Sequence, residues 1–155
     1  MPVFKIKLHS QGQVPIPPNA GLLTQLGPQV GVLIEIPEAL AKLLAEAGKP
    51  APTPVTGMAL IDTGATSSAV DTSVVATPGI NPVGTAQVGT AGGTVSQPVY
   101  PIRIQLQGVG LTINFSRVTG ALLKDMGLVA LLGRDMLSRM TLYYDGPNSE
   151  YTLAY

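Results

Sequence analysis

The chain has 155 residues, of which 45% are hydrophobic and only 12% charged, and nine basic and nine acidic residues give a net charge of zero. This length suits one domain, which we expect to span residues 1–155. Phosphate-backbone binding needs a surplus of Lys and Arg, so the neutral balance argues against nucleic acid as a partner. The absence of cysteine excludes disulfides and thiol nucleophiles. Because so few residues are charged, part of the protein surface must be apolar, and covering that surface with another subunit favours an oligomer.

The amino-terminal stretch alternates apolar and charged residues and lacks the continuous apolar core of a signal peptide. No window approaches the roughly 18 apolar residues that a membrane-spanning helix needs. We therefore expect a soluble, cytoplasmic protein with no membrane span. The single histidine, His9, cannot form a metal cluster by itself. We expect it at the surface and predict neither a metal site nor a cofactor.

Glycine and proline separate short apolar runs along the chain, which contains 18 Gly and 14 Pro. Short apolar runs separated by glycine and proline are typical of many short strands joined by turns. The first two strands are expected over residues 3–8 and 31–36. A polar stretch over residues 12–21 is expected to form a loop between them.

A helix is predicted over residues 37–48, as an insertion between strands. Pro37 suits its first turn, because the N–H that proline lacks would have no partner there. Leucines follow at helical spacing, and Gly48 is expected to end the helix. The prolines that come next make residues 49–57 a stiff connector.

The rest of the chain predicts an all-β fold with short helices. Residues 58–61, Met-Ala-Leu-Ile, form a short and wholly apolar strand, which predicts burial on both faces. A short helix is expected over residues 134–139 and a turn over residues 145–148. Further strands are expected over residues 85–89, 94–107, 111–118, 129–132, 140–144 and 151–154.

Asp62 directly follows the apolar strand, and small residues follow it at positions 63–66. A carboxylate at the end of a buried strand is costly, so a partner or a shared proton must compensate it. Small neighbours let a substrate or a second backbone approach closely. The same tripeptide, Asp-Thr-Gly, also forms a plain turn in which the aspartate accepts local backbone hydrogen bonds.

The stretch Ala-Leu-Ile-Asp-Thr-Gly-Ala-Thr-Ser at residues 59–67 resembles the active-site signature of aspartic proteases. Further along, Ala-Leu-Leu-Gly-Arg-Asp at residues 130–135 resembles the second hallmark of retropepsins, the single-domain aspartic proteases of retroviral type. The resemblance covers residues 31–155 and is to the cellular, often bacterial, members. It implies a closed β-barrel, the half-fold of acid proteases, that works as a homodimer and as an aspartic endopeptidase.

The resemblance implies that Asp62 is the catalytic carboxylate and that two copies of it meet across the homodimer. Like charges at short range make such a pair share one proton. The ionised carboxylate then activates a water, and the protonated one donates to the carbonyl of a peptide or protein substrate. The implied active-site loop comprises Thr63, Gly64, Ala65 and Thr66.

By the same resemblance, Thr63 hydrogen-bonds opposing backbone across the dimer, with a local turn bond as the alternative. Gly64 offers backbone contact to the substrate. The second loop, comprising Leu131, Leu132, Gly133 and Arg134, is implied to be structural.

A glycine-rich stretch over residues 88–95 lies between two strand-like runs and suits a mobile hairpin tip. The resemblance implies that this hairpin is a flap over the substrate, and an ordinary hairpin is the alternative. The flap residues are Thr90, Ala91, Gly92 and Gly93.

In the viral members the arginine that matches Arg134 pairs with an acidic residue shortly after Asp-Thr-Gly-Ala. Thr66 and Ser67 stand in those places here, so Asp71 and Asp135 are the candidate partners of Arg134.

Other interpretations stay open on the residues alone. One is a catalytically silent, dimeric peptide-binding or scaffolding domain of the same fold. Another is a β-barrel interaction module in which both motifs are coincidences. The final strand pair, at residues 141–144 and 151–154, is a candidate for the dimer sheet, and the sequence does not say which terminal segment contributes.

Overall fold

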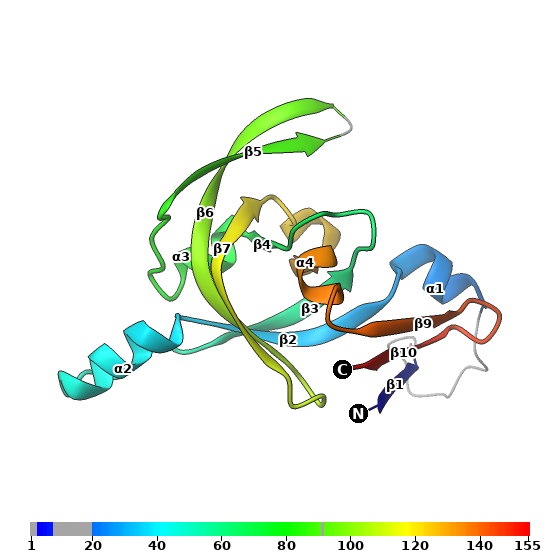
Figure 1. The fold of residues 1–155 in the computed structure, drawn as a ribbon, viewed down its shortest axis with the longest axis horizontal. Helices are drawn as coiled ribbons and strands as arrows, with labels where there is room; N and C mark the ends of the chain where they lie inside the picture. Colours follow the sequence, from blue (N-terminus) through cyan, green and yellow to red (C-terminus); the bar gives the residue numbers. More distant parts are fainter. Residues whose placement is uncertain (1–2, 8–19, 91) are drawn as a thin grey trace.

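The computed structural model describes residues 3–7, 20–90 and 92–155, which form a mostly β fold (Figure 1). The described strands are β1 (Val3–Lys7), β2 (Gln29–Glu35), β3 (Val55–Ile61), β4 (Ala69–Asp71), β5 (Gly84–Thr90), β6 (Gly93–Leu106), β7 (Thr112–Ala121), β8 (Leu128–Leu132), β9 (Thr141–Asp145) and β10 (Glu150–Ala154). The described helices are α1 (Ala20–Leu26), α2 (Glu38–Glu46), α3 (Thr72–Ala76), α4 (Arg134–Leu137) and the 3-10 helix η1 (Lys124–Met126).

Six of the described strands close into a barrel. Their order is β2-β3-β8-β4-β7-β6, and β6 pairs back onto β2, while β5 extends the sheet beyond β6. Most neighbours are antiparallel, but β3 runs parallel to β8 and β4 runs parallel to β7. Closure leaves these six strands without an open edge. The predicted closed β-barrel with short helices is confirmed.

The barrel interior is filled by alternate residues of its strands. In β2, Val30, Val32 and Ile34 are buried, and the residues between them are only partly so. In β6, Ile102 and Ile104 are fully buried in the same way. Successive side chains of a strand point to opposite faces, so this alternation turns one face of each strand into a common core.

A second sheet has the order β1-β10-β9, and both of its pairings are antiparallel. Tyr151 and Leu153 of β10 are fully buried and belong to the same core as the barrel residues. The Tyr151 hydroxyl donates a hydrogen bond to the carbonyl oxygen of Gln29 at the start of β2. This terminal sheet therefore packs on the barrel, with β1 and β9 as its two edges.

The strand predicted at residues 58–61 is the second half of β3, but the prediction that it is buried on both faces is wrong. Ala59 and Ile61 are buried, whereas Met58 is exposed and Leu60 is half-buried. β3 lies in the barrel wall, so one of its faces points to the core and the other points outward.

The other predicted strands, the short helix at residue 134 and the turn after β9 are present within a few residues of their predicted limits. Three differences stand out. β3 begins at Val55, inside the predicted connector, and α1 begins at Ala20, inside the predicted loop over residues 12–21. The rest of that loop, like His9, lies outside the described residues. β4, α3 and η1 were not predicted, because elements of three to five residues are too short for a periodic pattern.

α2 projects away from the barrel (Figure 1). None of its residues is buried, although Ala41 and Leu44 pack against the core. Leu43, on the other side of the helix, is 61% exposed. Gly48 has a φ of +66°, the left-handed conformation that ends helices and favours glycine. The helix thus ends as its sequence predicts.

Asp71 is a buried carboxylate that joins β4, α3 and η1. One oxygen caps α3 by accepting the N–H of Ser73 (2.9 Å), and the other accepts the N–H groups of Leu123 (2.7 Å) and Lys124 (2.9 Å). Burial alone would raise the pKa of Asp71. The hydrogen bonds from Ser73, Leu123 and Lys124 outweigh burial and hold this pKa below its ordinary value.

We expect acid to remove the stability that Asp71 provides. In the unfolded chain its pKa is near the ordinary value of about 3.9, and in the folded protein it is lower. Its contribution is therefore complete above about pH 5 and is lost as the pH falls through the folded pKa. Unfolding free energies of the wild type and Asp71→Asn, measured by denaturant titration from about pH 7 to about pH 3, should converge in acid. A gap that stays constant or widens would contradict this role.

Candidate active site

Asp62 lies at the end of β3, beside the end of β8. Its backbone N–H donates to the carbonyl oxygen of Leu132 (3.0 Å), which extends the parallel β3–β8 pairing by one step. The side chain is half-buried. The carboxylate therefore stands at the carboxyl ends of two adjacent parallel strands and keeps partial access to solvent.

The loop after Asp62 supplies hydrogen bonds to the carboxylate. Oδ1 accepts the N–H of Gly64 (2.8 Å) and the N–H of Ala65 (3.2 Å). A Cβ atom at position 64 would lie 3.1 Å from Oδ1, so glycine lets the backbone come this close. In the part of the chain that the structure describes, no group donates to Oδ2. The local turn is thus present, and it leaves one carboxylate oxygen available to other groups.

The fold brings the two sequence motifs together. β8 lies between β3 and β4, so the loop over residues 62–68 crosses the end of β8. There the N–H of Arg134 donates to the carbonyl oxygen of Ala65 (3.0 Å), and the N–H of Asp135 donates to that of Thr66 (3.2 Å). Residues distant in sequence therefore form one junction.

Leu131 and Leu132 belong to β8, where they pair with Leu60 and Ile61 of β3. Leu132 is fully buried. These two residues are therefore part of the barrel wall. In the loop beyond it, Thr63, Gly64 and Thr66 are exposed and Ala65 is half-buried.

Gly133 lies against the backbone of the Asp62 loop. A Cβ atom there would be 2.6 Å from the carbonyl carbon of Ser67 and 2.9 Å from the nitrogen of Ser68. Since backbone atoms cannot rotate out of the way, this crossing requires glycine.

Asp135 ties the loop to α4. Its carboxylate accepts the N–H of Ser68 (2.9 Å), the hydroxyl of Ser68 (2.7 Å) and the N–H of Met136 (2.9 Å). The Ser68 hydroxyl accepts the N–H of Gly133 in turn (3.0 Å), and Ser68 is fully buried. Hydrogen bonds to an ionised group are the stronger ones. We did not predict this role of Ser68. The sequence feature that could have indicated it is the position of a hydroxyl residue directly before the strand β4.

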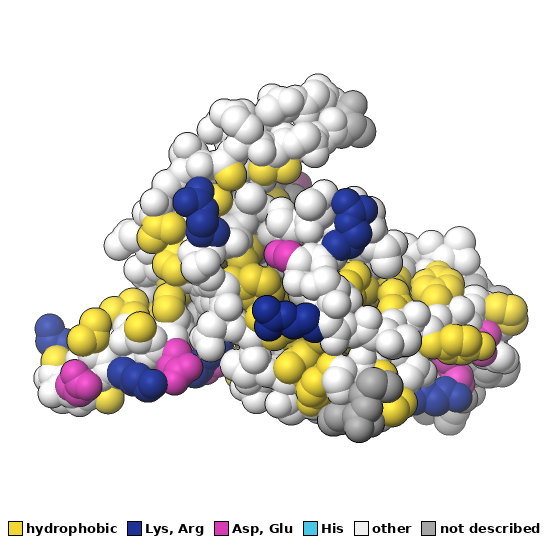
Figure 2. All heavy atoms as spheres, viewed as in Figure 1, with side chains coloured by type: hydrophobic (Ala, Val, Ile, Leu, Met, Phe, Trp, Pro, Cys, Tyr) yellow, Lys and Arg dark blue, Asp and Glu magenta, His cyan; other side chains and the backbone are white. Residues whose placement is uncertain are grey.

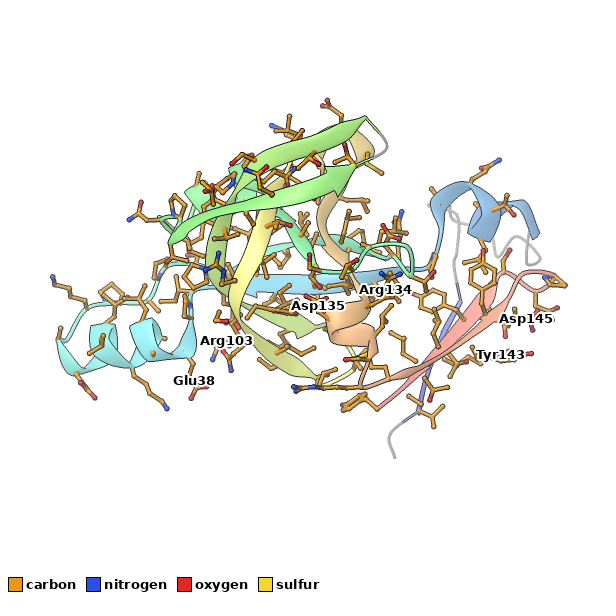
Figure 3. The ribbon with its side chains drawn as sticks, turned by 45° about the horizontal axis from the view of Figure 1, so that its top comes forward. Glu38, Arg103, Arg134, Asp135, Tyr143 and Asp145 are labelled. Carbon is orange, nitrogen blue, oxygen red and sulfur yellow. The ribbon has the colours of Figure 1, made fainter. Side chains whose placement is uncertain are left out.

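Arg134 binds neither aspartate proposed as its partner, so that prediction is wrong. Its guanidinium donates to the Thr66 hydroxyl (2.9 Å) and to the carbonyl oxygen of Thr63 (3.3 Å). Arg134 and Asp135 both lie at the start of α4 (Figure 3). A hydroxyl and a carbonyl oxygen thus replace the expected acid, and Arg134 holds the loop from its exposed side.

β5 and β6 form the predicted hairpin, which extends well beyond residues 88–95. At its tip Thr90 pairs with Gly93, and the Thr90 hydroxyl donates to the Gly93 carbonyl oxygen (2.8 Å). Gly93 has a φ of +117°, and Gly92 is exposed, while Ala91 lies outside the described residues. In both ribbon views the hairpin arches over the side of the barrel that carries β4 and α4 (Figures 1 and 3).

In the described ranges, no group of three or more His, Cys, Asp or Glu side chains is placed to hold a metal ion. None of the helices in those ranges has the length and apolar character needed to cross a membrane.

Gly133→Ala should destabilise the protein, because its methyl group would overlap the backbone of Ser67. Overpacking of this kind costs about 1–3 kcal/mol, to be measured as the loss in unfolding free energy. Gly89→Ala is the matched control, since a Cβ atom at Gly89 meets nothing within 4 Å. It should change stability by less than about 0.5 kcal/mol. Equal losses for the two variants would contradict the close crossing.

Solved structures similar to this chain include "EIAV protease complexed with the inhibitor HBY-793", with 24% identity, a TM-score of 0.47, and coverage of 72% of this chain and 86% of that chain. A retropepsin-like aspartic protease from Rickettsia conorii shows 13% identity, a TM-score of 0.41, and coverage of 99% and 92%. The retroviral protease-like domain of Ddi1 from Leishmania major shows 18% identity, a TM-score of 0.40, and coverage of 76% and 81%. No curated protein matches the sequence.

The sequence model of a family described as gag-polyprotein putative aspartyl protease matches residues 54–139. That range is more than half of the chain and runs from β3 to just beyond α4, so it includes the Asp62 loop, the hairpin and Gly133. The closed barrel with short helices agrees with the retropepsin-like fold that the resemblance implied. The chain belongs to the family of gag-polyprotein putative aspartyl proteases.

Proposed function

We propose that this chain is an aspartic endopeptidase that hydrolyses extended peptide or protein substrates, with Asp62 as its catalytic carboxylate. One observation carries the proposal. Asp62 lies within the matched range, at a junction that fixes its loop, and its Oδ1 is held by two backbone N–H groups. A carboxylate whose direction is fixed by the backbone is prepared for proton transfer.

The proposed active unit is a homodimer, because one chain supplies one such carboxylate. The other carboxylates near the loop, Asp71 and Asp135, are occupied by backbone and serine donors. Hydrolysis of this type needs a base and an acid together. Two copies of Asp62 at contact distance provide both, since repulsion between like charges makes them share one proton.

In this mechanism the ionised Asp62 takes a proton from a water molecule, whose oxygen attacks the carbonyl carbon of the peptide bond. The protonated Asp62 of the second copy gives its proton to the carbonyl oxygen. The tetrahedral intermediate then collapses. The Asp62 that took the water proton gives it to the leaving nitrogen as the carbon–nitrogen bond breaks, and the Asp62 of the second copy takes a proton from a hydroxyl of the intermediate, which restores the starting pair. The steps require no covalent bond to the protein and no cofactor.

The hairpin of β5 and β6 is the proposed flap. Most of its residues from Gly84 to Ser96 are exposed, which leaves room for an extended peptide beneath it. Closing over the substrate would exclude water from the reacting atoms. Thr63 is proposed to bond across the dimer and Gly64 to contact the substrate, and both are exposed in the single chain.

Asp62→Asn should abolish cleavage of an unstructured protein substrate, because an amide cannot take the proton of the attacking water. We expect a loss of at least about 100-fold at mildly acidic pH, with unchanged thermal unfolding. Asp125→Asn, an exposed aspartate in η1, is the matched control and should keep wild-type activity. Cleavage that survives Asp62→Asn would refute the assignment. A well-folded wild type that cleaves no substrate at any acidic or neutral pH would favour the silent peptide-binding domain.

Mixing the wild type with Asp62→Asn should reveal a shared site. After subunit exchange at equal concentrations, about half of the wild-type chains would sit in mixed dimers with only one Asp62. Activity should then fall to about half of that of the same amount of wild type alone. Activity that stays constant on mixing, despite demonstrated exchange, would rule out a site made by two chains.

A further inference from the structure

A cleft of about 450 Å³ lies between β7 and α4. One wall contains Leu111, Ile113 and Phe115, from β7 and the residue before it. Because these three residues alternate along the chain, their side chains share one face of the strand, and each is half-buried. Met136 of α4 and Met140 contribute to the other wall. Figure 2 shows apolar side chains and a basic side chain on this face of the molecule, between the places that β7 and α4 occupy in Figure 1.

The cleft is separate from the proposed catalytic carboxylate. Among the described residues, neither Asp62 nor any residue of its loop over 63–66 lines it. α4 contacts both places, because Asp135 accepts the hydrogen bonds of Ser68, and the next residue, Met136, faces the cleft. The proposed function therefore gives the cleft no role.

Arg139 is a cation at the border of the cleft. It is exposed, and no group in the described part of the chain accepts a hydrogen bond from its guanidinium or forms an ion pair with it. Asp135 also lines the cleft, but its carboxylate accepts hydrogen bonds from Ser68 and Met136. A guanidinium binds a carboxylate through two parallel hydrogen bonds. With Asp135 nearby, one cation suits a ligand with a single negative charge better than a phosphate dianion.

The size and lining of the cleft are those of a small-molecule site. Such sites measure about 300–1,000 Å³ and combine apolar walls with a few polar groups that orient the ligand. A second cleft, of about 540 Å³, lies at the base of α2. Its cation, Lys42, is already bound to Glu38 (2.8 Å) and is therefore less available to an anion. The cleft beside Arg139 thus offers the more favourable site for an anionic ligand.

We propose that the cleft between β7 and α4 binds a small free carboxylic acid with an apolar chain, such as a medium-chain fatty acid. Its carboxylate binds Arg139 at the border, and its chain lies between the β7 face and the two methionines. The chain gains free energy by leaving water, while the carboxylate stays partly hydrated. Methionine side chains are flexible and polarizable, so they adapt to the shape of an alkyl chain. This inference goes beyond the proposed function and does not depend on it.

A titration with decanoate at neutral pH tests the cleft through the methyl NMR signals of ¹³C-labelled methionines. The signals of Met136 and Met140 should shift and saturate, with a dissociation constant below about 1 mM for a ligand of this size. Met58 and Met126 are internal controls, because they are 39% and 61% exposed and lie outside the cleft. Their signals should stay in place. The absence of a saturable shift, or equal shifts of all four signals, would overturn the proposal.

The role of Arg139 is tested by removing either charge. Decanamide has the same chain without the carboxylate and should bind at least about tenfold more weakly than decanoate. Arg139→Gln should weaken decanoate by a similar factor and leave decanamide unchanged. Arg117→Gln, at an exposed arginine of β7 outside the cleft, is the matched control and should keep the wild-type constant within about twofold. Equal affinities of the wild type for decanoate and decanamide would overturn the proposal, even if Arg139→Gln failed to fold.

The same spectra identify other occupants. Shifts of the Met136 and Met140 signals on raising the protein concentration without decanoate would assign the cleft to a second copy of the chain and overturn the proposal. Asp62→Asn should bind decanoate like the wild type, because Asp62 lies outside the cleft. Loss of decanoate binding in a folded Asp62→Asn would contradict a site separate from the catalytic carboxylate.

Discussion

Hydrogen bonds from Ser68 to the Asp135 carboxylate hold the Asp62 loop against the start of α4, and the geometry of the site depends on them. Because Gly133 has no side chain, the two backbones can cross at this contact. The N–H groups that orient the Asp62 carboxylate belong to the loop that this junction fixes. A charge-assisted contact between residues 67 positions apart thus sets the direction of a carboxylate that it does not touch.

The chain fixes one oxygen of the Asp62 carboxylate and leaves the other available. One oxygen of Asp62 has no donor among the described residues. In the proposed homodimer a second copy of Asp62 would approach this oxygen, and the low charge content of the chain suits an interface between two copies.

The closed barrel is the rigid part of the fold, and the projecting hairpin of β5 and β6 is the part that can move. Six strands pair on both sides and enclose a continuous core. β5 pairs with β6 alone, and the hairpin residues near Gly92 are exposed. Segments with few buried contacts open at low cost, so the hairpin is the part of the fold suited to moving while the Asp62 loop stays fixed.

The sequence by itself determined what depends on neighbouring residues. The spacing of glycine and proline predicted where most strands lie. Gly48 predicted the end of α2, and the small residues after Asp62 predicted its local turn. Only the tertiary structure decided the closure of the barrel, the half-exposed position of Leu60, the bonding of Arg134 to Thr66, and the role of Ser68. The physical reason is that propensity and turn chemistry act over a few residues. Partners of a buried polar group and the outer face of a strand are set by segments that folding brings together from far along the chain.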